Sequence, residues 1–453
     1  MRLSDAGNAK RLVQLHGDEL RYCAQDRAWY YWDGRRWHED TEDTVMQMAI
    51  EVAQSWEEDA RKHPADSALH GKIMRHARVS ENLPGLKNML AIARTDPAIT
   101  LTPGAFDRSP DLLCVNNGVV DLTDCTFHPY NPANHITKLA PVTYERDRVS
   151  GEWLKFLTQV LPDPDIRAFI QRAVGYSITG HIDHECMFML LGDGRNGKTT
   201  FTGTLLHLLG DYAAQASSNA LMRQTTNGPN NELYVLRGRR FVLASETGER
   251  GQLNETLVKQ ITGGETVSVN PKYRSQTEFK PVWKIWLGTN HEPAIGGNDD
   301  AIWRRIIKVP FAVTIKHPKP ELKCRLLTNL TDRSGVLNWA LEGVRMWRSE
   351  GLNPPEAILT AAHDYRATHD LLGQFLNDKC QRHPNLRVYK ARLYAEYSSY
   401  CRLYTEKPKS KPGFGRELMA RGIGDDRDRG GRYWVGVGID ERVNLLPTHF
   451  QGE

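Results

Sequence analysis

A glycine-rich run near the middle of the chain carries residues whose types and spacing could hold a nucleoside triphosphate. Its residues follow the pattern G-x-x-x-x-G-K-T and are Gly192, Asp193, Gly194, Arg195, Asn196, Gly197, Lys198, Thr199 and Thr200. The glycines let backbone N–H groups approach phosphate oxygens. Lys198 would neutralise the β- and γ-phosphates, and Thr199 would offer a hydroxyl ligand to Mg²⁺. A glycine-rich turn that matches by chance is the alternative.

The stretches on either side of this run argue against a chance match. Met187 to Leu191 is apolar and strand-like, and Thr200 to Leu209 has the Leu and Phe spacing of a helix. A strand, a glycine-rich turn and a helix start are what a phosphate-binding loop needs. The sequence therefore predicts that ATP and Mg²⁺ bind here.

Polar residues end two further apolar stretches. Glu246 follows the stretch from Phe241, and Glu249 comes three residues later. A carboxylate in this place could hold Mg²⁺ or polarise the attacking water. Asn290 ends the stretch that begins at Lys284 and could orient that water and sense the γ-phosphate. Each residue alone could simply end a buried strand or form a turn, so the interpretation depends on their order behind the glycine-rich run.

Two basic segments accompany these stretches. One of the adjacent Arg304 and Arg305 could supply a guanidinium to the phosphate of a neighbouring subunit, although surface ion pairs are the simpler alternative. An alternating Thr-Val-Ser-Val pattern predicts a hairpin whose turn bears Lys272, Tyr273 and Arg274. This turn could contact DNA phosphates, but a hairpin tip is also where solvated charge usually lies.

The composition is that of an ordinary globular protein with several domains. The chain has 453 residues, of which 40% are hydrophobic and 25% charged. We expect neither a membrane span nor a signal peptide, because no apolar run is long enough and the stretch from Met1 to Asp5 is polar. The seven cysteines are scattered without a C-x-x-C pair, which argues against a zinc ribbon or a disulfide framework. We expect a cytoplasmic protein, and domains over residues 1–148, 149–355 and 370–453.

Two aromatic regions allow two interpretations each. Trp29 to Trp37 predicts a hairpin around an Asp-Gly turn, whose rings could stack bases, although packing within the fold is favoured. Lys379 to Arg432 holds 14 Lys or Arg against 6 Asp or Glu, which could be a footprint for duplex DNA. Four tyrosines at helical spacing lie within it: Tyr394, Tyr397, Tyr400 and Tyr404. These are equally well explained as the core stripe of a helix.

Taken in order, these motifs resemble superfamily 3 helicases of the AAA+ class. The branch is that of the phage and plasmid primase-helicases related to the poxvirus primase-helicase, and the resemblance covers nearly the whole chain. The matching segments of the motor are Asn196 in the G-x-x-x-N-G-K-[ST] form, Ser245–Thr247, Thr262–Arg274, Leu287–Asn290 and Ile302–Arg305. The segments that resemble the family's linker domain are Ser4–Ala9, Tyr31–Gly34 and Asn117–Leu122.

The resemblance implies an α/β AAA+ ATPase core with a central parallel sheet. A mainly helical α+β linker, or collar, domain would precede it and a winged-helix domain would follow. The family implies a homo-oligomeric ring, usually a hexamer, that uses ATP to unwind forked DNA by translocating on a single strand from 3′ to 5′. A separate primase or other replication proteins would be partners. An origin-binding initiator that melts DNA locally, a double-stranded DNA translocase and an ATPase that moves no nucleic acid are the alternatives.

The sequence departs from the family pattern at two places. Many members carry two adjacent acids where Ser245 here precedes the single Glu246, so it stays open which carboxylate serves Mg²⁺ and which the water. Family members often carry a primase domain, whereas here the linker-like region begins at once. We therefore expect no primer synthesis by this chain, which would be a stand-alone helicase or part of a longer primase-helicase.

Overall fold

The computed structural model describes residues 2–102, 104–217, 221–222, 232–245, 252–269, 277–295, 300–404 and 408–440. Contacts divide the chain into two units. The first contains residues 1–293 and 304–358, and the second contains residues 294–303 and 359–453. The expected boundary at residue 148 lies inside the first unit. The second unit takes in a ten-residue segment, 294–303, from within the predicted ATPase sequence.

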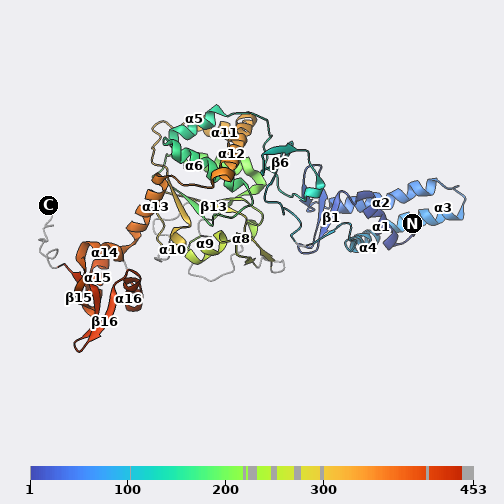
Figure 1. Cartoon of the computed structure of the whole chain (residues 1–453). Coiled ribbons are helices and arrows are strands. Elements are labelled where there is room, and N and C mark those ends of the chain that lie inside the picture. The colour runs from blue at the N-terminus through green and yellow to red at the C-terminus, as the bar shows by residue number, and fades with distance from the viewer. Residues whose placement is uncertain are drawn as a thin grey trace, which may run out of the picture. The chain divides into compact units, whose positions relative to one another are not determined.

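The chain begins with four helices and a small sheet (Figure 1). The helices are α1 (Asp5–His16), α2 (Thr44–Arg61), α3 (Ala68–Ser80) and α4 (Leu83–Ala93). The strands, in the order β3-β2-β1-β4, are β1 (Leu20–Cys23), β2 (Ala28–Trp32), β3 (Trp37–Glu39) and β4 (Thr100–Leu101). The predicted aromatic hairpin is β2–β3. Its Tyr30 and Trp37 are buried beside Phe106, which confirms packing for these two rings.

A second small sheet follows this region in the sequence and precedes the five-stranded sheet described below. Its strands are β5 (Leu112–Val115), β6 (Gly118–Asp121) and β7 (Thr126–His128), followed by the 3-10 turn η1 (Pro132–Asn134). The β5–β6 hairpin forms where the sequence has Asn116 and Asn117 between two apolar stretches. Residues 136–142 follow η1 within the first unit, and Ala140 and Val142 are fully buried there.

A five-stranded parallel sheet forms the centre of the first unit. Its order is β14-β8-β13-β10-β9, with β8 (Met187–Leu191), β9 (Ala213–Ala216), β10 (Phe241–Ser245), β13 (Lys284–Thr289) and β14 (Ile306–Pro310). The strands predicted for β8, β10 and β13 are confirmed. The register pairs Leu191 of β8 with Thr289 of β13, so Gly192 and Asn290 follow at the same edge.

Helices pack around this sheet. They are α5 (Gly151–Val160), α6 (Pro164–Ile178), α7 (Lys198–Leu209), α8 (Glu232–Val235), α9 (Glu255–Thr262), α11 (Pro320–Thr328) and α12 (Leu330–Glu350), and the 3-10 turn η2 (Gly210–Tyr212) follows α7. The amphipathic stretch from Glu152 to Ile178 forms two helices, because Pro162 and Pro164 interrupt it. Asp163 begins the second helix by accepting a hydrogen bond from Asp165 N at 2.8 Å.

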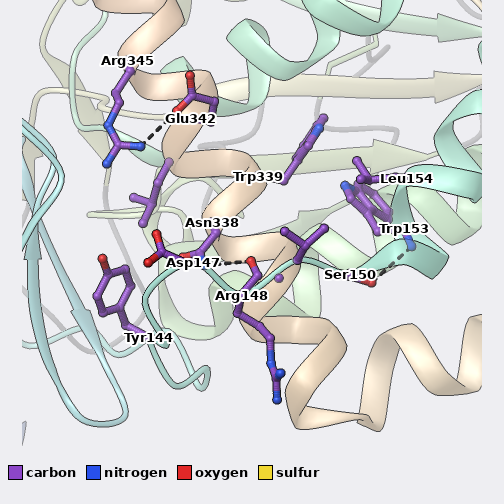
Figure 2. Close-up of a pocket in the computed structure, with 13 residues that line it drawn as sticks. Tyr144, Asp147, Arg148, Ser150, Trp153, Leu154, Asn338, Trp339, Glu342 and Arg345 are labelled. Carbon is purple, nitrogen blue, oxygen red and sulfur yellow. Dashed lines mark hydrogen bonds and ion pairs between the residues drawn. The ribbon is translucent and has the colours of Figure 1, made fainter.

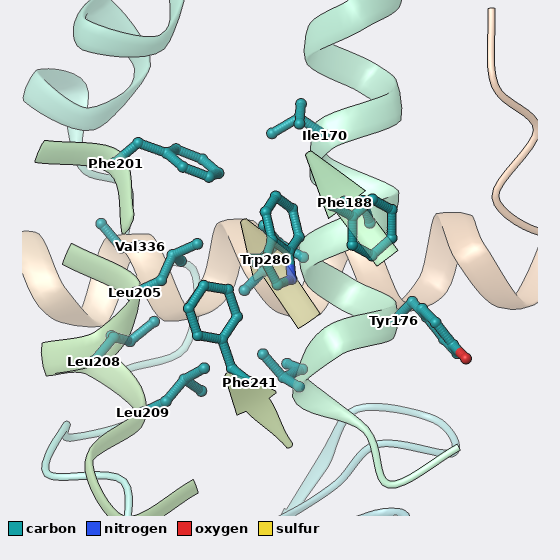
Figure 3. Close-up of a cluster of buried hydrophobic side chains, with 14 of the residues drawn as sticks. Ile170, Tyr176, Phe188, Phe201, Leu205, Leu208, Leu209, Phe241, Trp286 and Val336 are labelled. Atoms are coloured by element: carbon teal, nitrogen blue, oxygen red, sulfur yellow. The ribbon is translucent and has the colours of Figure 1, made fainter. Parts of the chain in front are cut away.

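Aromatic rings fill the core of the sheet (Figure 3). The fully buried Trp286 of β13 stacks on Phe188 of β8 with ring centroids 4.5 Å apart and on Phe241 of β10 at 5.5 Å. Its indole Nε1 donates to Ser177 Oγ at 3.0 Å. These neighbours fix β13 between the strand that precedes the glycine-rich loop and β10.

A hairpin projects from the chain between α9 and β13. Its strands are β11 (Val267–Val269) and β12 (Thr277–Phe279), which pair antiparallel from Val267 opposite Phe279. This confirms the hairpin that the alternating pattern predicts. Its tip, with Lys272, Tyr273 and Arg274, lies outside the described residues.

The second unit contains a compact α/β module. Its elements are α10 (Asp300–Trp303), α13 (Glu356–His369), which begins in the first unit, α14 (Leu371–Lys379), β15 (Cys380–Tyr389), α15 (Lys390–Leu403), α16 (Lys411–Ala420), β16 (Gly424–Asp428) and β17 (Gly431–Ile439). The strand order is β15-β17-β16. Tyr397 and Tyr400 are buried in the module's core, whereas Tyr404 is exposed. The tyrosine stripe is therefore mainly a core stripe.

Among the described residues, no helix has the length and apolar character of a membrane span. In the same part of the chain, no group of three or more His, Cys, Asp or Glu side chains is arranged to hold a metal ion.

Candidate nucleotide-binding site

The glycine-rich run forms a tight loop between β8 and α7. A Cβ atom on Gly192 would lie 2.2 Å from Asn196 Nδ2 and 2.3 Å from the carbonyl oxygen of Phe311, so only glycine fits there. Gly197 has a φ of +87° and directly precedes α7, and a Cβ atom would lie 2.5 Å from Val160. The loop is thus held closely against β14 and α5 by residues that the sequence pattern alone does not name.

Lys198 and Asn290 meet at the carboxyl edge of the sheet. The ammonium group of Lys198 donates to Asn290 Oδ1 at 3.0 Å and to the carbonyl oxygen of Gly192. Lys198 is only 8% exposed. Burial lowers its pKa, while the charge of Asp193 acts in the opposite direction. The sequence placed these two side chains at the ends of separate strands, and the register of β8 and β13 brings them together.

The loop also offers hydrogen-bond donors without protein partners. Asn196 is 4% exposed, and its Nδ2 has no hydrogen-bond partner among the described residues. Gly197, the N-cap of α7, provides no side-chain bond to the first turn of that helix. Unpaired N–H groups at a helix N-terminus attract anions. This donor set fits a phosphate group.

A cavity of about 330 Å³ adjoins the loop. It is lined by Lys198, Thr199, Thr202, Gly203, Leu206, His207, Gln215, Leu243, Gly288, Asn290, Lys323 and Leu327. Thr199 is exposed, so its hydroxyl can meet a metal ion beside a phosphate. Sequence reasoning missed His207, Gln215 and Lys323, because no motif marks them and they come together only through the fold.

The two candidate carboxylates, Glu246 and Glu249, lie outside the described residues. The strand that precedes them is described, and its last residue, Ser245, pairs with Gly288 of β13. β10 therefore ends at the same edge of the sheet as the strands that lead to Lys198 and Asn290.

The two adjacent arginines have different surroundings. Arg305 is 8% exposed, and its guanidinium binds Glu185 Oε2 at 2.5 Å and Thr262 Oγ1 at 3.2 Å. Arg304 is exposed. The described contacts thus hold Arg305 within its own chain and leave the Arg304 side chain at the surface.

A second cavity, of about 400 Å³, lies between α5, α12 and the segment that leads into α5 (Figure 2). In it, the amide of Asn338 donates to the carbonyl oxygen of Arg148 at 2.9 Å. Trp153 stacks on Phe201 of α7 at 5.8 Å and meets Trp339 edge-on at 5.4 Å. This cavity therefore borders the packing behind α7, and none of the predicted site residues lines it.

Two protein-family models match the chain. Residues 9–162 match the model described as "D5 N terminal like". Residues 190–305, which include the glycine-rich loop, match a model described as "Family of unknown function (DUF5906)".

Proteins of large DNA viruses are similar in sequence. One of Acanthamoeba polyphaga mimivirus, named "Putative helicase", is 27% identical over 62% of this chain and 32% of its own length. One of Frog virus 3, also named "Putative helicase", is 25% identical over 72% of this chain and 34% of its own length. One of African swine fever virus, named "Putative primase", is 26% identical over 48% of this chain and 24% of its own length. The chain thus spans about a third or less of these relatives.

Solved structures share the fold at low sequence identity. The A form apo structure of the NrS-1 C terminal region has a TM-score of 0.55 at 11% identity and covers 97% of this chain and 100% of that one. Another apo structure of that region, residues 305–718, has a TM-score of 0.53. The chain is thus similar in its N-terminal domain to the model described as "D5 N terminal like", and in sequence to viral proteins named putative helicase or putative primase.

Proposed function

We propose that this protein is an ATP-driven DNA helicase built on an AAA+ core of superfamily 3. It would unwind DNA during the replication of a phage, plasmid or other mobile element. The observation that carries the proposal is the hydrogen bond from Lys198 Nζ to Asn290 Oδ1, at 3.0 Å, across two neighbouring parallel strands. It joins a phosphate-binding lysine to a residue suited to sensing the γ-phosphate. Ligands of open parallel sheets bind at such carboxyl edges, where strand connections run in opposite directions.

The residues of the loop fit the triphosphate of ATP. On ATP binding, Lys198, which now donates to Asn290, would turn to the β- and γ-phosphate oxygens. The buried Asn196 amide and the first turn of α7 would supply further donors. Thr199 would hold Mg²⁺, which neutralises developing charge on the phosphates. Glu246 or Glu249 would orient the attacking water, and Asn290 would position it once Lys198 is engaged.

Hydrolysis in this proposal needs a neighbouring subunit. Arg304 is exposed and follows α10, whereas Arg305 is held by Glu185 and Thr262. We assign Arg304 as the residue that reaches the next subunit's ATP, and Arg305 as a structural support. A guanidinium supplied in this way is worth on the order of 10³–10⁵ in rate. A ring, usually a hexamer in this family, brings every Arg304 to a neighbour.

DNA would pass through the ring. The β11–β12 hairpin supports a pore contact by Lys272, Tyr273 and Arg274, since both its strands lead to that tip. The order α14, β15, α15, α16, β16, β17, with β17 in the middle of the sheet, supports a winged helix that contacts duplex DNA at the fork. Translocation on one strand, from 3′ to 5′, would separate the duplex.

The experiment is steady-state ATP hydrolysis with and without single-stranded DNA, beside native mass, for the wild type, Arg304→Ala and Arg305→Ala. The proposal expects a ring-sized assembly whose turnover DNA stimulates. Arg304→Ala should bind ATP yet lose turnover, whereas Arg305→Ala should lose thermal stability first. A monomer with turnover that DNA leaves unchanged would overturn the helicase assignment. Strand separation of a forked substrate distinguishes a helicase from a translocase on duplex DNA.

A further inference from the structure

The segment just before Arg304 packs with the C-terminal unit. Residues 294–303 group with residues 359–453 by their contacts, and Arg304 begins the return to the first unit. The last residues of this segment form α10, which ends at Trp303. The chain thus reaches Arg304 directly from a helix held by another part of the protein.

Aromatic rings of α13 hold Trp303. Trp303 is 9% exposed, and its ring meets the ring of Tyr365 edge-on with centroids 5.2 Å apart. The ring of His369, one turn further along α13, lies 6.2 Å from Trp303 and 4.9 Å from Tyr365. Tyr365 itself is 1% exposed. An edge-to-face arrangement of buried rings is directional, so it fixes the orientation of Trp303 as well as its position.

An ion pair joins the same two helices. Arg366 of α13 binds Asp300, the first residue of α10. Both side chains are well exposed, so this pair contributes less than the rings. Together the ion pair and the rings connect α13 to both ends of α10.

The end of α13 is connected in turn to the α/β module. Asp370 follows α13, and its Oδ1 accepts hydrogen bonds from Gly373 N at 2.9 Å and from Arg421 Nη2 at 2.6 Å. Arg421 directly follows α16. A continuous series of described contacts therefore leads from α16 through α13 to the residue before Arg304.

We propose that α13 is the positioning element for Arg304, and that Trp303, held by Tyr365 and His369, is the positioning residue through which it acts. The proposal rests on the proposed function, because only that function gives Arg304 its role at the next subunit's ATP. It deepens that function by making turnover depend on the C-terminal unit. DNA bound by the α/β module can then alter the reach of Arg304 by moving α13, without touching the nucleotide.

The test compares kcat and KM for ATP in the wild type, Trp303→Leu, Trp303→Phe, Arg304→Ala and the double variant Trp303→Leu/Arg304→Ala. Trp303→Leu should lower kcat on the order of tenfold to a hundredfold with KM unchanged. Trp303→Phe, which keeps a ring, should recover most of that loss. In the double variant, kcat should fall no further than in Arg304→Ala alone, because both changes remove one function. Trp32→Leu, in the N-terminal sheet, is the matched control and should keep the wild-type kcat.

The proposal would be overturned if the loss of kcat in the double variant equalled the product of the two single losses. A normal kcat in Trp303→Leu would also overturn it. If Trp303→Leu does not fold, the exposed pair decides: Asp300→Arg and Arg366→Asp should each lower kcat, and the exchange of both charges should restore it. An exchange that fails to restore kcat would then overturn it. A normal turnover in Arg304→Ala would instead overturn the arginine assignment of the proposed function, so the two failures differ.

Discussion

At the scale of single residues, the phosphate-binding loop depends on space that only glycine leaves. Gly192 lies where a Cβ atom would come within 2.3 Å of both Asn196 Nδ2 and Phe311 O. The carbonyl of Phe311 cannot retreat easily, because it belongs to the backbone that follows β14, whereas Asn196 Nδ2 is the end of a side chain. The local sequence explains why a glycine is needed in a tight turn, but the fold decides which atoms surround it.

We expect Gly192→Ala to destabilise the protein by about 1–3 kcal/mol, as overpacking does, and to weaken ATP binding. The measurement is the midpoint of thermal unfolding beside nucleotide affinity. Gly71→Ala is the control: Gly71 lies within α3 with open space around its Cα, so alanine there should stabilise by about 0.5–1 kcal/mol. Wild-type stability and affinity in Gly192→Ala would contradict the geometry of the loop.

A second residue-scale prediction concerns the core. The Nε1 of Trp286 is buried and donates to Ser177 Oγ at 3.0 Å. In Ser177→Ala this donor stays buried without its hydroxyl partner, which should cost about 1–3 kcal/mol of unfolding free energy. Denaturant unfolding measures the loss, and Ser177→Thr, which keeps a hydroxyl, should lose less. Equal losses in the two variants would mean that volume, and not the hydrogen bond, determines the effect.

At the scale of elements, the sequence predicted what local patterns specify. Apolar runs identified β8, β10 and β13, the Thr-Val-Ser-Val pattern identified the β11–β12 hairpin, and helical spacing identified α7 and α15. The break between α5 and α6 could have been found from Pro162 and Pro164. β14 was not predicted, because its residues Ile306 to Pro310 show no alternation of apolar and polar side chains and form a strand through pairing with β8.

Contacts between distant segments were beyond local patterns. Arg305 is buried because Glu185 and Thr262, both distant in sequence, receive its guanidinium. The meeting of Lys198 and Asn290 follows from strand register, which a single sequence does not specify. The attachment of segment 294–303 to the C-terminal unit has no sequence signal at all.

The start of β13 yields an element-scale prediction. Lys284 is 2% exposed, and its Nζ donates to the carbonyl oxygens of Thr179, His181 and Val282. It thereby ties β13 to the residues that end α6. Lys284→Met keeps the length of the side chain but leaves these carbonyls unpaired, so we expect a loss of about 2–4 kcal/mol. Chemical denaturation tests this, and an unchanged or raised stability would show that desolvation of the ammonium outweighs its three hydrogen bonds.

At the scale of the first unit, ion pairs connect the N-terminal sheet to segments beside the five-stranded sheet. Arg36 binds Asp211 of η2, and Asp26 Oδ1 binds Arg237, which follows α8, at 2.7 Å. The Asp26 carboxylate is 9% exposed. Asp211 lies in η2, which directly precedes β9, and Arg237 lies between α8 and β10. The N-terminal region is thus tied to the strand that carries the predicted carboxylates at its end.

The Asp26–Arg237 pair gives this connection a pH dependence. Burial opposes ionisation of Asp26, but the hydrogen bond and charge of Arg237, together with hydrogen bonds from Cys23 and Tyr30, outweigh it and hold the pKa below its ordinary value of 3.8. The folded protein therefore binds fewer protons at Asp26 than the unfolded chain does, and the stabilisation is fully present above about pH 4. It is lost as the pH falls through the depressed pKa.

Asp26→Asn keeps the shape of the side chain and removes this titration. At pH 7 we expect the variant to be less stable than the wild type by about 1.5–3 kcal/mol, the range for hydrogen bonds to charged groups. The difference should shrink as the pH falls below about 4, because the wild type then loses the same charge. Unfolding midpoints between pH 7 and pH 3 measure it. Glu57→Gln, from the exposed pair with Arg61, should change stability by less than about 0.5 kcal/mol at any pH. If the stability difference between wild type and Asp26→Asn stayed the same from pH 7 to pH 3, packing of the Asp26 side chain, and not its charge, would connect the two regions.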